Sequence, residues 1–112
     1  MPLVHHELCF GCGRANLFGL LAELERRADG TVAGRCFIKQ DHQGPEPGVA
    51  HPGLVACALI EAMVHAGAGP LRQLNVRFES AAPVGGFLEL RASAQEASAC
   101  VEGRPVATAG LD

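Results

Sequence analysis

The chain has 112 residues, which is room for one domain with a single hydrophobic core. An apolar fraction of 48% argues against disorder, and a formal net charge of −3 without a cluster of basic residues argues against nucleic-acid and anionic-membrane partners. The sequence has neither an apolar stretch of about 18 residues nor a basic region followed by an apolar one, so we expect a cytoplasmic protein with no membrane partner. Because so short a chain builds a modest core, we also expect a partner subunit.

The first third of the chain predicts an irregular leader followed by a β-hairpin. Residues 1–16 are rich in Cys, His and Gly and show no periodicity. Residues 17–27 and 31–39 each contain alternating apolar and polar positions, which is typical of half-buried strands. Asp29-Gly30 lies between them and is a strong hairpin signal.

The middle of the chain predicts a loop and then a buried helix. Residues 40–53 contain too many Pro and Gly for more than a short strand at Gly48–His51. Residues 54–66 are apolar on nearly every face, which indicates a helix of three to four turns that is buried on more than one side. Gly67-Ala68-Gly69-Pro70 should end this helix.

The last third returns to a period of two. Strands are expected over 71–80, 87–97 and 100–106, with a turn at 83–86 and another at Gly103. One apolar helix among antiparallel strands can bury most of its circumference only if the sheet curls around it. The sequence therefore predicts an α+β fold, a single domain over residues 1–112, with the sheet wrapped on a central helix.

The leader carries a Cys-x-x-Cys pair, Cys9 and Cys12, with His5 and His6 just upstream. The chain has five cysteines, and without a secretory signal we expect reduced thiols. Two thiolates and an imidazole could supply three zinc ligands, with His6, Cys9 and Cys12 as the set, but a second ligand pair is missing. The remaining candidates are scattered: Cys36, His42 and Cys100. The favoured interpretation is that small residues shape a tight leader; a redox role is disfavoured because the pair does not open a helix.

Two features of the helix region could carry chemistry. At His51-Pro52-Gly53, a helix N-terminus could stabilise an oxyanion, although Pro52 has no N–H and an ordinary Pro-started helix explains the motif equally well. Further on, Cys57, Glu61 and His65 recur every four residues and so share one face. Glu61 is the only carboxylate in the apolar run, and it is either a buried general base with His65 as its charge partner or part of the solvated edge.

Taken in order, several motifs resemble hotdog-fold acyl-CoA thioesterases of the phenylacetate-degradation type. The motifs cover nearly the whole chain: Cys9-Phe10-Gly11-Cys12-Gly13, Asn16, Gly19-Leu20, His42-Gln43-Gly44, Gly48 through Met63, Leu74-Asn75-Val76-Arg77-Phe78 and Pro83-Val84-Gly85. The resemblance implies an antiparallel sheet around one long helix at about residues 53–66. It also implies an acyl-CoA substrate with no further cofactor, and homodimers or tetramers with active sites at the dimer interface.

The resemblance also implies roles for individual residues. In such enzymes the first Gly of a His-Gly-Gly turn polarises the thioester carbonyl, and an Asp or Glu nine residues after the His activates water. Pro52 and Ile60 occupy those two positions here. The catalytic candidates that remain are Glu61, His51, Gly53 and His65, and the expected substrate contacts are His42, Gly44, Asn75 and Arg77.

Three hypotheses remain open at this point. The preferred one is a thioesterase with altered machinery, in which the Gly53 N–H faces the carbonyl and Glu61 is the base. The second is a non-catalytic hotdog module that binds an acyl thioester or another small ligand, and Pro52 and Ile60 motivate it. The third is a small metal-stabilised protein that uses the histidines and cysteines of the leader.

Overall fold

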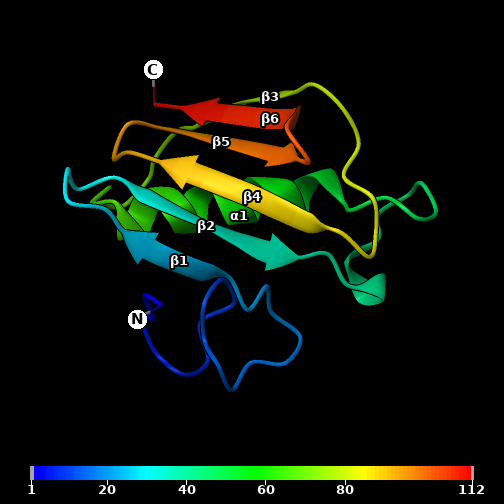
Figure 1. Cartoon of the computed structure of the whole chain (residues 1–112), viewed down its shortest axis with the longest axis horizontal. Coiled ribbons are helices and arrows are strands. Elements are labelled where there is room, and N and C mark those ends of the chain that lie inside the picture. Colours follow the sequence, from blue (N-terminus) through cyan, green and yellow to red (C-terminus); the bar gives the residue numbers. More distant parts are fainter. Residues whose placement is uncertain (1, 112) are drawn as a thin grey trace.

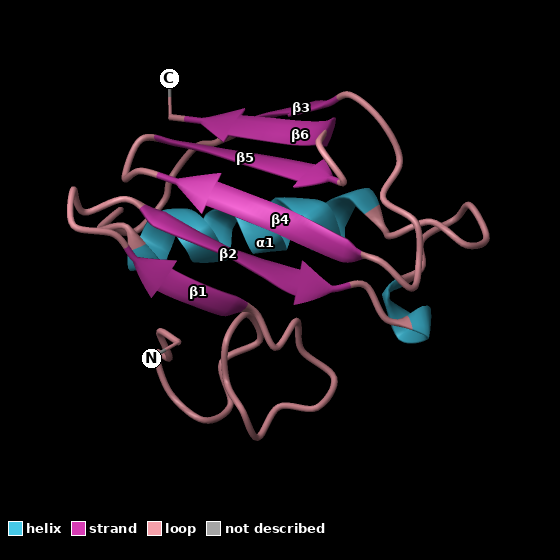
Figure 2. Cartoon of the chain, viewed as in Figure 1, coloured by secondary structure: helices cyan, strands magenta, loops and turns pink. Residues whose placement is uncertain are grey.

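The computed structural model describes residues 2–111, which form six strands, one α-helix and one short 3-10 helix. The element bounds are β1 Glu23–Arg26, β2 Val32–Phe37, η1 Gln40–His42, α1 Pro52–His65, β3 Asn75–Phe78, β4 Phe87–Ala92, β5 Glu96–Val101 and β6 Arg104–Gly110. Figure 1 shows them in chain order, and Figure 2 shows the same view by element type.

The six strands form one antiparallel sheet in the order β1-β2-β4-β5-β6-β3. The single long helix lies along one face of this sheet (Figure 1). The largest fully buried side chains come from both layers, including Leu24, Leu88 and Leu90 of the sheet and Leu59 and Met63 of α1. This arrangement confirms the predicted α+β architecture, with a sheet that covers a central helix.

The boundaries of α1 follow from local chemistry. Pro52 occupies the first helical position, where its missing N–H costs nothing, and His51 is the N-cap. After the C-cap Ala66, Gly67 has φ +106°, a conformation that favours glycine and ends the helix. The predicted helix is confirmed to within about two residues at each end.

The N-terminal hairpin is confirmed, but its first strand is shorter than predicted. β1 begins at Glu23 instead of Leu17, and β2 begins at Val32. Leu21 has φ +49°, which lies outside the β region, so the extended strand cannot continue toward the leader. Leu17 is largely exposed, whereas strand pairing with β2 begins only at Glu23.

The C-terminal region has one more strand than predicted. The expected strand over 87–97 is interrupted because Ser93 makes a turn: its Oγ accepts the backbone N–H groups of Gln95 and Glu96. The expected strand over 100–106 is likewise wrong. Glu102 (φ +49°) and Gly103 (φ +81°) instead form a tight turn between β5 and β6, because two consecutive positive φ angles reverse the chain.

The loop before α1 has more order than its composition suggests. It contains η1, an isolated bridge from Gln43 to Ala50, and another from Val49 to Pro83. These bridges fix the path of the chain into the helix N-terminus. Within residues 2–111, no helix combines the length and the apolar character needed to cross a membrane.

Candidate functional site

The start of α1 is organised by His51. Its Nδ1 accepts the Gly53 N–H at 2.8 Å, and its carbonyl accepts the N–H groups of Leu54 and Val55 at 2.9 and 3.2 Å. Pro52 has no N–H to offer. The backbone donors of the first turn are therefore engaged inside the helix cap, including the Gly53 N–H that was expected to face a substrate carbonyl.

This cap determines which nitrogen of His51 can donate. A neutral imidazole carries one N–H and one acceptor nitrogen, so acceptance at Nδ1 places the proton on Nε2. The His51 side chain is exposed at the positive end of the helix dipole. The group that this helix start offers to a ligand is thus an imidazole N–H.

One stripe of α1 is left open by the sheet. Gly53 and Cys57 are exposed, Ile60 and Val64 are half-buried, and their spacing of four, three and four residues puts them on a common face. The stripe is apolar from end to end. Ile60, at the position that carries a carboxylate in the resembled thioesterases, lies within it.

Glu61 does not lie on the open stripe. Glu61 is only 8% exposed, and its side chain points toward the leader. There, Oε2 lies 3.1 Å from His5 Nδ1, and Oε1 lies 3.7 Å from Cys9 Sγ. His65 Nε2 lies 2.8 Å from the same Oε2, although this approach departs from hydrogen-bond geometry. The predicted pairing of Glu61 with His65 is therefore present, but both side chains are buried beneath the leader.

The leader brings His5, Cys9 and Cys12 together beside Glu61. His5 Nδ1 lies 3.6 Å from Cys9 Sγ and 3.5 Å from Cys12 Sγ, and the His5 ring stacks on His65 with centroids 3.8 Å apart. His6, in contrast, is exposed and accepts the Leu8 N–H, so it stands outside the cluster. The expected set of His6 with two cysteines is corrected to His5 with the same cysteines.

Burial dominates the electrostatics of this cluster. It raises the pKa of Cys12 to about 12, with the Glu61 side chain adding to the effect. Burial also lowers the pKa of His65, and the neighbouring His5 adds to that shift. In the absence of a bound cation, this environment favours a neutral Cys12 thiol and a neutral His65 ring.

His42 and Gly44 support the start of α1. His42 is 4% exposed; its Nδ1 accepts the Lys39 N–H, and its carbonyl accepts the His51 N–H at 2.9 Å. A Cβ at Gly44 would lie 2.8 Å from the His51 Cα, so glycine permits this close approach. Both residues position His51.

We expect His42 to make the stability of the protein depend on pH. Burial is the main cause that lowers its pKa, and Lys39 contributes. The native state therefore resists protonation, so stability is complete above the unfolded pKa of about 6.5 and falls as the pH drops toward the lower native pKa. Urea unfolding between about pH 7.5 and 5.5 should show a steeper loss for wild type than for His42→Gln; equal slopes would contradict this assignment.

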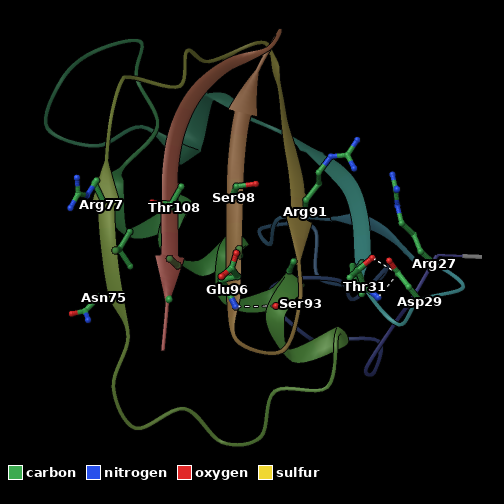
Figure 3. Close-up of a pocket in the computed structure, with 16 residues that line it drawn as sticks. Arg27, Asp29, Thr31, Asn75, Arg77, Arg91, Ser93, Glu96, Ser98 and Thr108 are labelled. Carbon is green, nitrogen blue, oxygen red and sulfur yellow. Dashed lines mark hydrogen bonds between the residues drawn. The ribbon is translucent and has the colours of Figure 1, made fainter. Parts of the chain in front are cut away.

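Asn75 and Arg77 lie elsewhere. They alternate with Val76, which packs against the core, so they project from the sheet face opposite α1. Figure 3 shows both on β3, where they line a depression of about 790 Å³ together with Arg91, Ser98 and Thr108. The four expected substrate contacts thus divide between the helix start and the outer face of the sheet.

Solved structures of thioesterase-superfamily proteins share this fold. One thioesterase superfamily protein superposes with a TM-score of 0.80 over 95% of this chain at 22% sequence identity, and this chain spans 61% of its length. The E. coli PaaI protein from the phenylacetic acid degradation operon gives a TM-score of 0.69 at 12% identity, covering 80% of this chain and 75% of that one.

A hypothetical thioesterase protein from Streptococcus pneumoniae TIGR4, solved with coenzyme A, gives a TM-score of 0.63 at 16% identity over 79% of this chain and 80% of its own. No protein-family model matches the chain, and no curated protein matches it. At these identities the similarity establishes the architecture. The chain therefore has the hotdog fold that these thioesterase-superfamily structures share, as its sequence motifs predicted.

Proposed function

We propose that this protein is a hotdog thioesterase that binds an acyl-CoA thioester at the start and along the open stripe of α1. The observation that carries the proposal is the fold, which matches a thioesterase superfamily protein over 95% of the chain. A neighbour solved with coenzyme A supports the choice of a CoA thioester. An apolar stripe that begins beside an exposed imidazole N–H suits an acyl chain whose carbonyl lies at the helix start.

We assign the polarising role to His51. In thioester hydrolysis, water adds to the carbonyl carbon, negative charge develops on the carbonyl oxygen, and the CoA thiolate leaves. A donor aimed at that oxygen stabilises the transition state. Pro52 and Gly53 offer no free backbone N–H in this structure, whereas His51 Nε2 carries a proton and is exposed.

The proposed site is completed by a second copy of the chain. Positions 51 and 60 are nine residues apart, which is about 13.5 Å along a helix axis and too far for both to act on one thioester. A second helix that runs antiparallel would bring its own position 60 near His51. The open apolar stripe and the half-exposed Phe78 at the β3 edge are consistent with homodimers or tetramers, which light scattering of the purified protein would detect.

A second candidate function is acyl-thioester binding without turnover. Ile60 favours it because the open stripe carries no carboxylate, and Glu61 favours it because its side chain is held beneath the leader. On either candidate, the geometry argues against Glu61 as the direct base. Equal hydrolysis rates for wild type and Glu61→Gln would confirm that Glu61 is not the base.

The test is a panel of acyl-CoAs that differ in chain length, with thiol release measured for wild type and His51→Asn. Asparagine keeps an N-cap acceptor for the Gly53 N–H but removes the imidazole donor. We expect kcat/KM to fall about 100-fold while the melting temperature changes little. Acyl-CoA binding without thiol release by wild type would establish the second candidate, and absence of both binding and release would overturn the proposal.

A further inference from the structure

We propose that His5, Cys9, Cys12 and Glu61 form a tetrahedral zinc site that fastens the leader to α1. Each of these residues offers one ligand atom, and the four atoms lie within 4.8 Å of one another. Three come from the leader and the fourth comes from the helix, 49 positions after Cys12 (61 − 12). This inference goes beyond thioester chemistry, and the experiment that tests the zinc site does not require thioesterase activity.

Three distances between the ligand atoms match those expected around a zinc ion. Typical bond lengths are about 2.3 Å to sulfur and about 2.0 to 2.2 Å to nitrogen and oxygen, so tetrahedral angles place a sulfur about 3.6 Å from a nitrogen or an oxygen ligand. His5 Nδ1 lies 3.6 and 3.5 Å from the two sulfurs, and Cys9 Sγ lies 3.7 Å from Glu61 Oε1. Glu61 supplies the fourth ligand, which the leader does not contain.

The surroundings support the same assignment. The His5 backbone N–H donates to Cys12 Sγ at 3.1 Å, a contact that stabilises a metal-bound thiolate. His65 packs against two of the proposed ligands, because its ring stacks on His5 and its Nε2 lies 2.8 Å from Glu61 Oε2. Gly11 lies within the Cys-x-x-Cys loop, and a Cβ there would stand 2.2 Å from Glu61 Oε1, so glycine leaves the space that this carboxylate occupies.

The donor set points to zinc and to a structural role. Two thiolates with an imidazole and a carboxylate in a tetrahedral arrangement suit Zn²⁺, whereas Mg²⁺ and Ca²⁺ require oxygen ligands. Four protein ligands leave no position for a substrate or a reactive water, which is the pattern of a structural site. His5 is partly exposed, so the ion has a path from solvent.

The experiment measures metal in the full-length protein, purified under reducing conditions, by elemental analysis. We expect about one zinc per chain. The metal-free protein reloaded with Co²⁺ should show the ligand-field bands of a tetrahedral site and a thiolate charge-transfer band. Cys9→Ser and Cys12→Ser should lose both signals, because each removes a proposed thiolate ligand.

His6→Asn and Cys57→Ser are matched controls, because they remove an imidazole next to the site and a thiol away from it, and both should retain zinc. Cys9 and Cys12 lie outside the main hydrophobic core cluster, so their variants should remain folded, and circular dichroism checks this. Wild type that takes up neither Zn²⁺ nor Co²⁺ while both thiols remain reactive would overturn the site. Acyl-CoA hydrolysis is a separate measurement, so the two proposals fail independently.

Discussion

Replacing Ile60 with Asp is expected to raise kcat/KM for acyl-CoA hydrolysis about 100-fold or more. Ile60 is half-buried on the open stripe, at the place where the resembled thioesterases carry their carboxylate. Asp at this position would supply a general base for the attacking water, and such a base typically contributes 100- to 10,000-fold. Thiol release across the acyl-CoA panel measures the gain.

Ile60→Asn is the matched control, because its side chain is polar and nearly the same shape as that of Asp but cannot accept a proton from water. It should leave the rate near that of wild type. A gain shared by Asp and Asn would mean that side-chain size or polarity at position 60 governs substrate entry. No gain in the Asp variant, with acyl-CoA binding retained, would place the carbonyl away from this stripe and contradict the proposed binding mode.

The elements that sequence predicted well are those whose signals are local. The helix is marked by eleven apolar residues among the thirteen positions 54–66 and by a Gly-rich stop, and the first hairpin is marked by Asp29-Gly30. The break at Ser93 was missed because it has no Gly or Pro, and a single serine hydroxyl makes the turn. Where a strand begins also depends on its pairing with residues that are distant in sequence. The alternation of apolar and polar residues over 17–27 therefore could not predict that β1 begins at Glu23.

The cluster of His5, Cys9, Cys12 and Glu61 was predicted only as two separate halves. The sequence showed a Cys-x-x-Cys leader that lacked ligands and a lone Glu61 in an apolar helix, and each half had its own explanation. Only the fold brings residue 61 against residues 5 to 12. One signal in the sequence could have linked the two halves. The leader holds an incomplete set of metal ligands, and the same small domain contains one carboxylate in an apolar helix that could complete it. Gly11, whose missing side chain makes room for Glu61, was equally unreadable without the contact.

Removal of the Leu59 side chain tests the wrapped-helix architecture directly. Leu59 is fully buried between α1 and the sheet, so Leu59→Ala should lower the free energy of unfolding by about 2 to 5 kcal/mol. The loss combines the transfer of fewer apolar atoms with the cavity that remains. Against a typical total of about 5 to 15 kcal/mol, this change removes a large share of the stability, and urea unfolding at neutral pH measures it.

The neighbouring Ile60→Ala is the informative comparison, because it shortens a similar side chain one position along the same helix. Ile60 is only half-buried in a single chain, so its loss from an isolated monomer should cost about 1 kcal/mol. If a second copy covers the open stripe, the cost should approach that of Leu59→Ala and should grow with protein concentration, because unfolding then includes dissociation. A small cost for Leu59→Ala would contradict the fold, whereas a small cost for Ile60→Ala at all concentrations would contradict only the dimeric site.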